Sequence, residues 1–218
     1  MNYLQNLWNA LDLGSLRDTL LRVAAVLLCL ILHETCHGIA AFFLGDPTAK
    51  RNHRLSLNPL RHIDWIGLAA MVLTGVGWAK PVPVNPFYFK GDRTKGMMLV
   101  SIAGPLTNLV LCFLAYFIYV AGNGFGQIPF LSAFLWQFLT LNVYLAVFNL
   151  IPIPPLDGSK ILAGFLPKSV AYKYLTTIEQ YGFLILMVLI IFNITDWILV
   201  PIVNGIMFIF TMILQLIF

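Results

Sequence analysis

Two histidines and a glutamate stand close together in the stretch LILHETCHGI, where His33 and His37 are four residues apart and Glu34 follows the first of them. Residues four apart project from the same face of a helix, so both rings can reach one ion. This HExxH spacing is typical of zinc sites in which the carboxylate handles a proton of water. Ionisable groups inside an apolar run are costly unless a cation or a function retains them. The stretch therefore predicts a metal centre rather than a histidine pair satisfied by hydrogen bonds.

A third ligand is needed, because catalytic zinc usually takes three protein side chains and leaves its fourth position open. Asp157 is one candidate, since it ends an apolar run in NLIPIPPLDG, where three prolines prevent a regular helix and could let it dip inward to the histidines. Its alternative role is that of a carboxylate capping the next helix. Glu179, the only glutamate besides Glu34, lies in a polar segment and is the other candidate. Cys36 is expected to face away as a packing residue.

The composition is that of a membrane protein, with 60% hydrophobic residues, 10% charged residues and a mean hydropathy of +0.86. The formal net charge of +4 does not predict a nucleic-acid partner, because the basic residues flank apolar runs, where orientation signals and lipid headgroups explain them. The three cysteines have no CxxC spacing, so neither a disulfide framework nor a thiolate metal site is indicated.

Long apolar runs predict membrane spans at residues 19–44, 97–121 and 131–153. Residues 2–17 have the pattern of an amphipathic interfacial helix. Residues 45–96 are polar and rich in proline, and there RLSLNPL and KPVPVNPFYF predict short edge strands with a re-entrant element, IGLAAMVLTGVGW, between them. The predicted fold is an all-α polytopic membrane protein with a three-helix core, flanking helices and a small membrane-associated β element after the first span.

This pattern divides the chain into an interfacial helix at residues 1–18, an intramembrane core at 19–160 and a C-terminal part at 161–218. The C-terminal part is expected to begin as a polar, lysine-bearing linker. Two apolar runs follow, at 182–199 and 201–218, and the proline between them allows either two spans or one span with an interfacial helix.

Lysines and arginines are shared unevenly among the loops, with eight in residues 45–96, three in 157–181 and none in 122–130. Basic loops stay in the cytoplasm, so we expect a multi-pass protein of the cell membrane with its N-terminus outside. The histidines then lie roughly 10 to 17 Å below the cytoplasmic surface. Asn108, in the second span, falls at the same level, where its amide could bind a substrate carbonyl or pair with a neighbouring helix.

Five motifs occur in order over most of the chain: HETCHGIAAFFLGDPTAK, LNPLRHID, GWAKPVPVNP, AGPLTN and FNLIPIPPLDG. Jointly they resemble the site-2 protease family of intramembrane zinc metalloproteases. The resemblance implies that His33, His37 and Asp157 bind one Zn²⁺ ion, that Glu34 is the general base and acid, and that Asn108 lies close to the catalytic centre. It also implies a core of three spans, a zinc ion nearer the cytoplasmic side and a membrane-associated sheet after the first span.

The resemblance also implies the reaction, which is hydrolysis of peptide bonds within or near the transmembrane segments of membrane protein substrates, as in regulated intramembrane proteolysis. A substrate helix must unwind locally, and one of the predicted edge strands could hold the extended segment by strand addition. Many members carry a PDZ or CBS domain, whereas 218 residues leave no room for one, so we expect the short form.

Three residues depart from the pattern of similar members: His53, Trp65 and Ser159 stand where glycine, proline and glycine are usual. None of them is a predicted ligand. His62 and Asp64 receive no catalytic role and are expected to pin a turn. Two alternative functions stay open, namely a membrane protease of another class whose HExxH motif is completed by the downstream glutamate, and a metal-binding membrane scaffold without turnover.

Overall fold

The computed structural model describes residues 16–67 and 80–218, and all regular elements in these ranges are helices. Within them, five helices are long and apolar enough to cross a membrane: α2 (Leu16–Phe43), α5 (Arg93–Ala121), α6 (Pro129–Asn149), α8 (Lys168–Ile191) and α9 (Ile194–Gln215). Shorter helices connect them: α3 (Thr48–Arg51), η1 (Pro59–Arg61), η2 (Pro86–Tyr88), η3 (Asn123–Phe125) and α7 (Asp157–Phe165).

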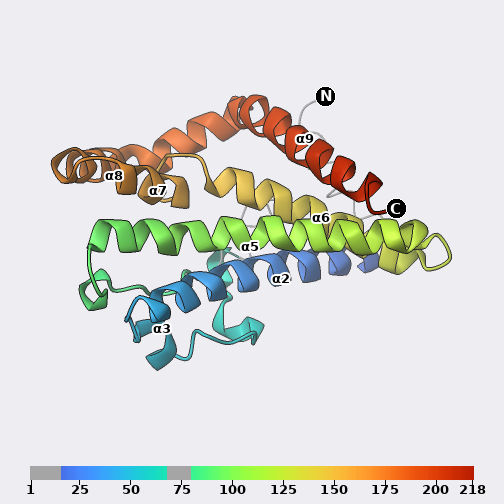
Figure 1. Cartoon of the computed structure of the whole chain (residues 1–218), viewed down its shortest axis with the longest axis horizontal. Coiled ribbons are helices and arrows are strands. Elements are labelled where there is room, and N and C mark those ends of the chain that lie inside the picture. The colour runs from blue at the N-terminus through green and yellow to red at the C-terminus, as the bar shows by residue number, and fades with distance from the viewer. Residues whose placement is uncertain (1–15, 68–79) are drawn as a thin grey trace.

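The core is formed by α2, α5 and α6, and α5 lies between the other two in Figure 1. Small side chains let these helices approach closely, because alanines and cysteines occupy their contacts together with large apolar residues from α6. The buried members of this cluster on the three helices include Ala25, Cys29, Cys112, Ala115, Phe138, Leu139 and Val143. The outer helices cover this core from one side, with α9 on α6 and α8 on α7 and α9.

The three predicted core spans correspond to α2, α5 and α6, with differences at their ends. α6 ends at Asn149, four residues before the predicted end at 153, because the proline-rich stretch that follows cannot continue a helix. Residues 157–181, expected to be a polar linker, are mostly helical instead, in α7 and the first part of α8. Their lysines interrupt the apolar pattern without interrupting the helix, since lysine is a good helix former.

A tight loop, residues 150–156, joins α6 to α7. The backbone of Gly158 packs directly on the end of α6, because a Cβ atom there would lie 2.2 Å from the carbonyl oxygen of Leu150. Only glycine permits so close an approach. After this loop α7 packs on α5, and Asp157 is its first residue.

The predicted β element is wrong for the residues that the structure describes, since neither RLSLNPL nor KPVPVNPFYF forms a strand. The first segment bends into η1, where the side chain of Asn58 accepts a hydrogen bond from the backbone of Leu60. The second has no regular secondary structure from residue 80 to residue 85, where η2 follows, and we call this segment the strap. Pro81 and Pro83 give the strap no amide hydrogens at two of its positions, so it cannot form a regular ladder.

The strap takes its hydrogen bonds from side chains of other segments. The amide of Val82 donates to Oε2 of Glu34 on α2 at 2.7 Å, and the amide of Asn85 donates to Oδ2 of the buried Asp46 at 2.6 Å. Lys80 is held at both backbone atoms, since its amide donates to the carbonyl of His62 and its carbonyl accepts from Arg54. Carboxylates from the first span and the turn after it thus bind the amides that a neighbouring strand would bind in a sheet.

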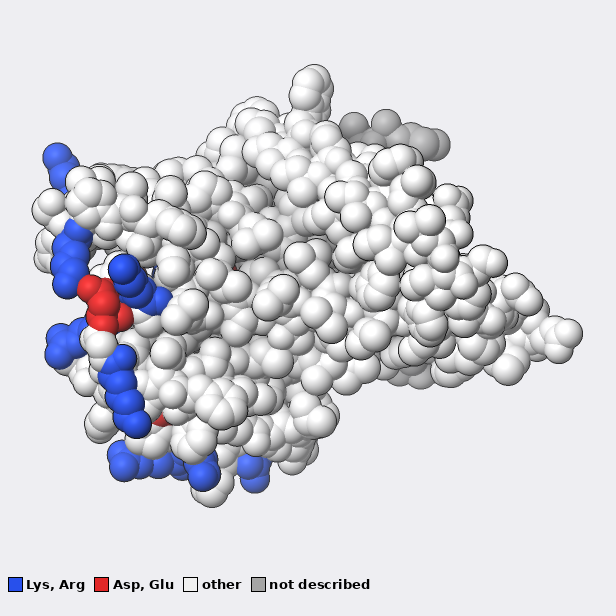
Figure 2. All heavy atoms as spheres, viewed as in Figure 1, with Lys and Arg blue, Asp and Glu red and all other residues white. Residues whose placement is uncertain are grey.

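Basic side chains gather at one end of the molecule (Figure 2), the end at which α5 and α8 begin and α3 lies (Figure 1). The rest of the visible surface is almost free of charge, as a surface in contact with lipid must be. Two predicted elements, the interfacial helix at 2–17 and the re-entrant segment at 66–78, fall almost entirely outside the described residues.

Candidate metal centre

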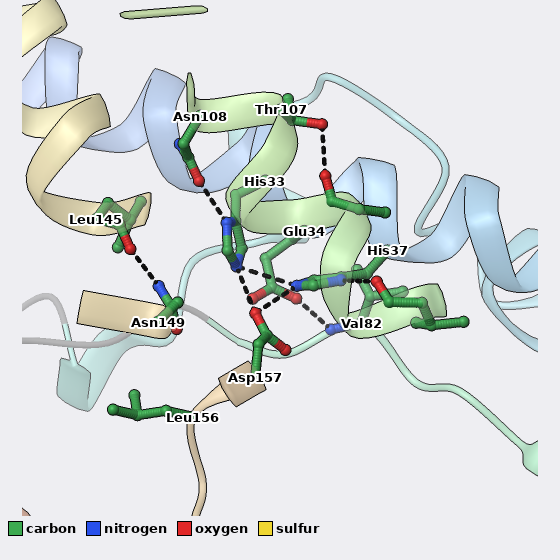
Figure 3. A network of polar contacts seen from close by, with 12 residues as sticks. His33, Glu34, His37, Val82, Thr107, Asn108, Leu145, Asn149, Leu156 and Asp157 are labelled. Carbon is green, nitrogen blue, oxygen red and sulfur yellow. Dashed lines mark hydrogen bonds and ion pairs between the residues drawn. The ribbon is translucent and has the colours of Figure 1, made fainter. Parts of the chain in front are cut away.

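The two histidines of HETCH lie on the face of α2 that is turned into the core, and each is at least nine-tenths buried. Their rings stand edge to face with centroids 4.5 Å apart. Asp157 reaches them from the start of α7, with its Oδ2 atom 3.4 Å from Nε2 of His33 and 3.1 Å from Nε2 of His37 (Figure 3). The two Nε2 atoms are 3.0 Å apart. Helices distant in the sequence thus bring three donor atoms to one point.

The outer nitrogens of both rings face acceptors. Nδ1 of His33 lies 2.5 Å from Oδ1 of Asn108, and Nδ1 of His37 lies 2.7 Å from the carbonyl oxygen of Val100. An amide or carbonyl oxygen can only accept, so each Nδ1 carries the proton and donates it. The Nε2 atom of each ring thus points toward the other ring and toward Asp157, and in a neutral ring with its proton on Nδ1 this is the atom that can bind a metal.

This donor set fits a zinc ion. Oδ2 of Asp157 is buried, forms no hydrogen bond in the part of the chain that the structure describes, and lies within 3.4 Å of both Nε2 atoms. A metal cation at this point would be bound by all three of these atoms at once. Ligand atoms about 2.0 to 2.1 Å from a tetrahedral zinc stand about 3.3 Å from each other, close to the separations observed here. His33, His37 and Asp157 are also the one group of metal-ligating side chains that the described residues bring together.

Gly104 provides the space for the rings. It lies in α5, and a Cβ atom at this position would come 2.4 Å from Nε2 of His37 and 2.6 Å from Cε1 of His33. The backbone of α5 therefore forms one wall of the centre. The glycine of the AGPLTN motif is explained by this close approach.

Glu34 lies beside the donor atoms in Figure 3, and it is only half-buried. One of its oxygens, Oε2, accepts the amide hydrogen of Val82 in the strap at 2.7 Å. This bond fixes the direction of the carboxylate, so that Glu34 is oriented by a backbone group rather than by a mobile side chain. A held carboxylate next to a metal centre is suited to proton transfer.

Asn108, predicted near the centre with a possible role in substrate binding, is fully buried on α5. Both ends of its amide are engaged within the protein, since Oδ1 accepts from His33 and Nδ2 donates to Oδ1 of Asn142 at 2.7 Å. The geometry therefore assigns it to holding His33. Asn142 had no predicted role, although a polar residue inside the apolar run LTLNVYLAVFN is a signal of a buried polar contact.

The remaining candidates lie away from the donor atoms. Glu179 is exposed on α8, outside the metal-ligating group. Asp64 accepts the amides of Ile66 and Gly67, as expected of a residue that pins a turn. His62 is buried near the strap with its Nε2 atom 2.7 Å from the carbonyl of Ser56, and burial lowers its pKa, a shift opposed by this hydrogen bond. The positive φ of His53 at 54° shows why the usual residue there is glycine.

Fold and centre together define a multi-pass membrane protein built around a candidate site for one metal ion. Comparison with known proteins gives the family. The model of peptidase family M50 matches residues 126–192. The chain is 40% identical over 190 residues to "Putative zinc metalloprotease YwhC" of Bacillus subtilis (strain 168), covering 84% of this chain and 85% of that protein. It is 32% identical over 177 residues to "Putative zinc metalloprotease Rip2" of Mycolicibacterium smegmatis, covering 79% of this chain and 67% of that protein.

The chain belongs to this family, the site-2 proteases, as the motifs predicted. Its class is therefore that of the membrane zinc metallopeptidases, and zinc is its cofactor. No solved structure matches the chain.

Proposed function

We propose that this protein is an intramembrane zinc metalloendopeptidase that hydrolyses peptide bonds within or near the transmembrane segments of membrane protein substrates. The observation that carries the proposal is the meeting of His33, His37 and Asp157 at 3.0 to 3.4 Å, beside the carboxylate of Glu34 and inside a bundle of apolar helices. A binding site alone requires the ligands, whereas hydrolysis also requires the carboxylate.

In this proposal each residue has a separate task. His33, His37 and Asp157 would hold the zinc ion. The bound ion would act as a Lewis acid, which polarises a peptide carbonyl and lowers the pKa of water. Glu34 accepts a proton from the attacking water and passes it to the leaving amine. The Val82 amide keeps one oxygen of Glu34 in place, so the other oxygen is available for the proton.

The proposal includes an orientation in the membrane. The basic end of the molecule faces the cytoplasm and the N-terminus faces out, in accord with the distribution of charge. His37 and His33 precede the end of α2 at Phe43 by six and ten residues, which corresponds to roughly 9 and 15 Å along the helix. Water thus has a short path to the centre from the cytoplasmic side. In this proposal the core of residues 19–160 performs the reaction. Helices α8 and α9 lie outside this core, and each of them spans the membrane.

The substrate in this proposal is a transmembrane helix that unwinds before cleavage. Its peptide bonds are hidden in helical hydrogen bonds, so only an extended segment can be attacked. The strap lies against Glu34 through the amide of Val82, so an extended substrate segment that reaches this carboxylate would pass beside the strap.

The test is cleavage of a single-span model substrate by purified protein in liposomes, with wild type compared to Glu34→Gln. The amide has the same shape but cannot accept the proton, so we expect product formation to fall at least about 100-fold. Zinc content, measured on the same samples, should remain one ion per chain in both. Equal product from the two proteins would refute proteolysis and leave the metal-binding scaffold as the function.

A further inference from the structure

A line of buried amides leads from the metal centre into the helix bundle. It begins at His33, whose Nδ1 atom contacts Asn108 on α5, and continues from Asn108 to Asn142 on α6 at 2.7 Å. Asn142 then donates to the carbonyl oxygen of Phe138 at 2.8 Å and to Sγ of Cys29 on α2 at 3.0 Å. Both asparagines have no exposed surface. The line thus connects all three core helices at the level of the site.

The direction of every hydrogen bond in this line follows from its far end. The carbonyl of Phe138 can only accept, so it takes the NH₂ group of Asn142 and turns the oxygen of Asn142 toward Asn108. That oxygen in turn takes the NH₂ group of Asn108, which leaves the oxygen of Asn108 for His33. An oxygen at this place requires the proton of His33 to be on Nδ1.

The two histidines are therefore anchored by different means. His37 donates to the carbonyl of Val100, a backbone group on α5 that no substitution removes and whose orientation the helix fixes. His33 donates to a side-chain amide, which could be reversed by rotation about its last bond. A reversed Asn108 would present its NH₂ group to Nδ1, and the proton of His33 would then belong on Nε2, the atom that must bind the metal.

We propose that Asn142 is a positioning residue for the zinc centre, which acts through Asn108 to keep the amide of Asn108 in the orientation that leaves Nε2 of His33 free for the metal. Asn142 touches neither the donor atoms nor Glu34. The inference rests on the zinc centre proposed above but does not depend on proteolysis. Partners of metal-ligating histidines typically account for 10- to 100-fold in metal affinity.

A purely structural role is the competing explanation, because polar side chains also join helices in membranes. The two roles differ in what happens when Asn108 is replaced by aspartate. A carboxylate offers His33 an acceptor oxygen in either orientation, so it needs no partner to orient it. In an Asn108→Asp background the positioning role of Asn142 disappears, whereas its contribution to helix packing remains.

The experiment measures the zinc affinity of the detergent-purified full chain by competition with a chromogenic chelator. We expect Asn142→Leu to weaken zinc binding about 10-fold in the wild-type background and by less than about 2-fold in the Asn108→Asp background. Tyr116→Phe is the matched control, since it removes a hydrogen bond between α5 and Thr211 of α9 that is remote from the centre. It should leave the affinity unchanged.

Two results would overturn the inference: an unchanged zinc affinity in Asn142→Leu, or an equal loss in both backgrounds, which would indicate packing alone. If Asn142→Leu does not fold, Asn142→Ala is compared in the same two backgrounds with the same criteria. Affinity is read without cleavage, so a protein that binds zinc in this pattern but cuts no substrate would refute the proposed function and leave the role of Asn142 intact.

Discussion

The inner helices α2, α5 and α6 and the outer helices α8 and α9 are all long and apolar, yet they follow different rules. In the most apolar window of each helix, 33 to 39% of the residues are buried on the inner three, against 11% on α8 and 17% on α9. The inner helices carry His33, His37, Asn108 and Asn142 in mid-span, and each of these has a polar partner. Polar groups at this depth require protein on every side.

The outer helices present large apolar side chains to their surroundings instead. Phe183 on α8 and Trp197 and Phe208 on α9 are each more than two-thirds exposed. Such positions need only be apolar, because lipid contacts any apolar side chain about equally well. The five helices thus have similar hydropathy but different constraints. The inner three depend on the exact positions of their side-chain contacts, whereas the outer two depend only on an apolar composition.

Removing one carboxylate from the inner helices and one from the outer helices should give the largest difference in zinc affinity. Asp157→Ala removes one of the three donor atoms of the inner centre. Loss of a hydrogen-bond partner of a ligand typically weakens metal binding 10- to 100-fold, so loss of the ligand itself should lower zinc affinity by more than about 100-fold. Glu179→Ala alters an exposed side chain on α8 and should leave the zinc content at one ion per chain. Metal analysis of the two purified variants decides, and the opposite pattern would assign the third ligand to Glu179.

A glycine-to-alanine exchange in each region should give the next largest contrast. At Gly104 the new Cβ atom would collide with both histidine rings, so we expect at least a 10-fold loss of zinc affinity and a destabilisation of about 1 to 3 kcal/mol. At Gly205 on α9 a Cβ atom meets nothing within 4 Å. Alanine there should leave zinc binding unchanged and stabilise the helix by up to about 1 kcal/mol.

Chelator competition and thermal melting in detergent measure both quantities for each glycine variant. A Gly104→Ala protein that binds zinc normally would show that the rings can move away from α5, and that the wall described here is not rigid.

A substitution at the contact between the inner and outer helices should have the smallest effect, and only on the free energy of unfolding. The hydroxyl of Tyr116 on α5 bonds Thr211 on α9 at 3.0 Å. Thr211→Val should lower the free energy of unfolding by about 0.6 kcal/mol, the average for such bonds between membrane helices, without a change in zinc affinity. Equilibrium unfolding in mixed micelles gives the first value. A change in zinc affinity would mean that α9 is coupled to the centre and that the two regions are not independent.

Much of the centre could be predicted because helical spacing is local information. The four-residue step in HETCH places both rings on one face in any helix, and the prolines before Asp157 end the helix that precedes it. Asn142 was missed because its role arises only when α5 and α6 pack together. The direction of an amide cannot be derived before its partners are known.

The fold was predictable where hydropathy determines the structure, as in the core spans. It was not predictable where hydrogen bonds between distant segments determine the structure. The core spans followed from length and apolarity alone. The strands were wrongly predicted because alternation and proline content indicate an extended chain without saying what it pairs with. Here the partners of the strap are carboxylates, Glu34 and Asp46, which lie 48 and 39 residues earlier in the chain.

The strap also gives the centre a spectroscopic reporter. Proline has no amide hydrogen, so Pro81 and Pro83 are silent in amide spectra and Val82 stands between them as an isolated signal. Its hydrogen bond to Oε2 of Glu34 makes the resonance frequency sensitive to the charge on that carboxylate. In a sample labelled only at valine, the peak of Val82 is identified by its loss in Val82→Ile. The chemical shift of this peak would then report whether Glu34 carries a proton.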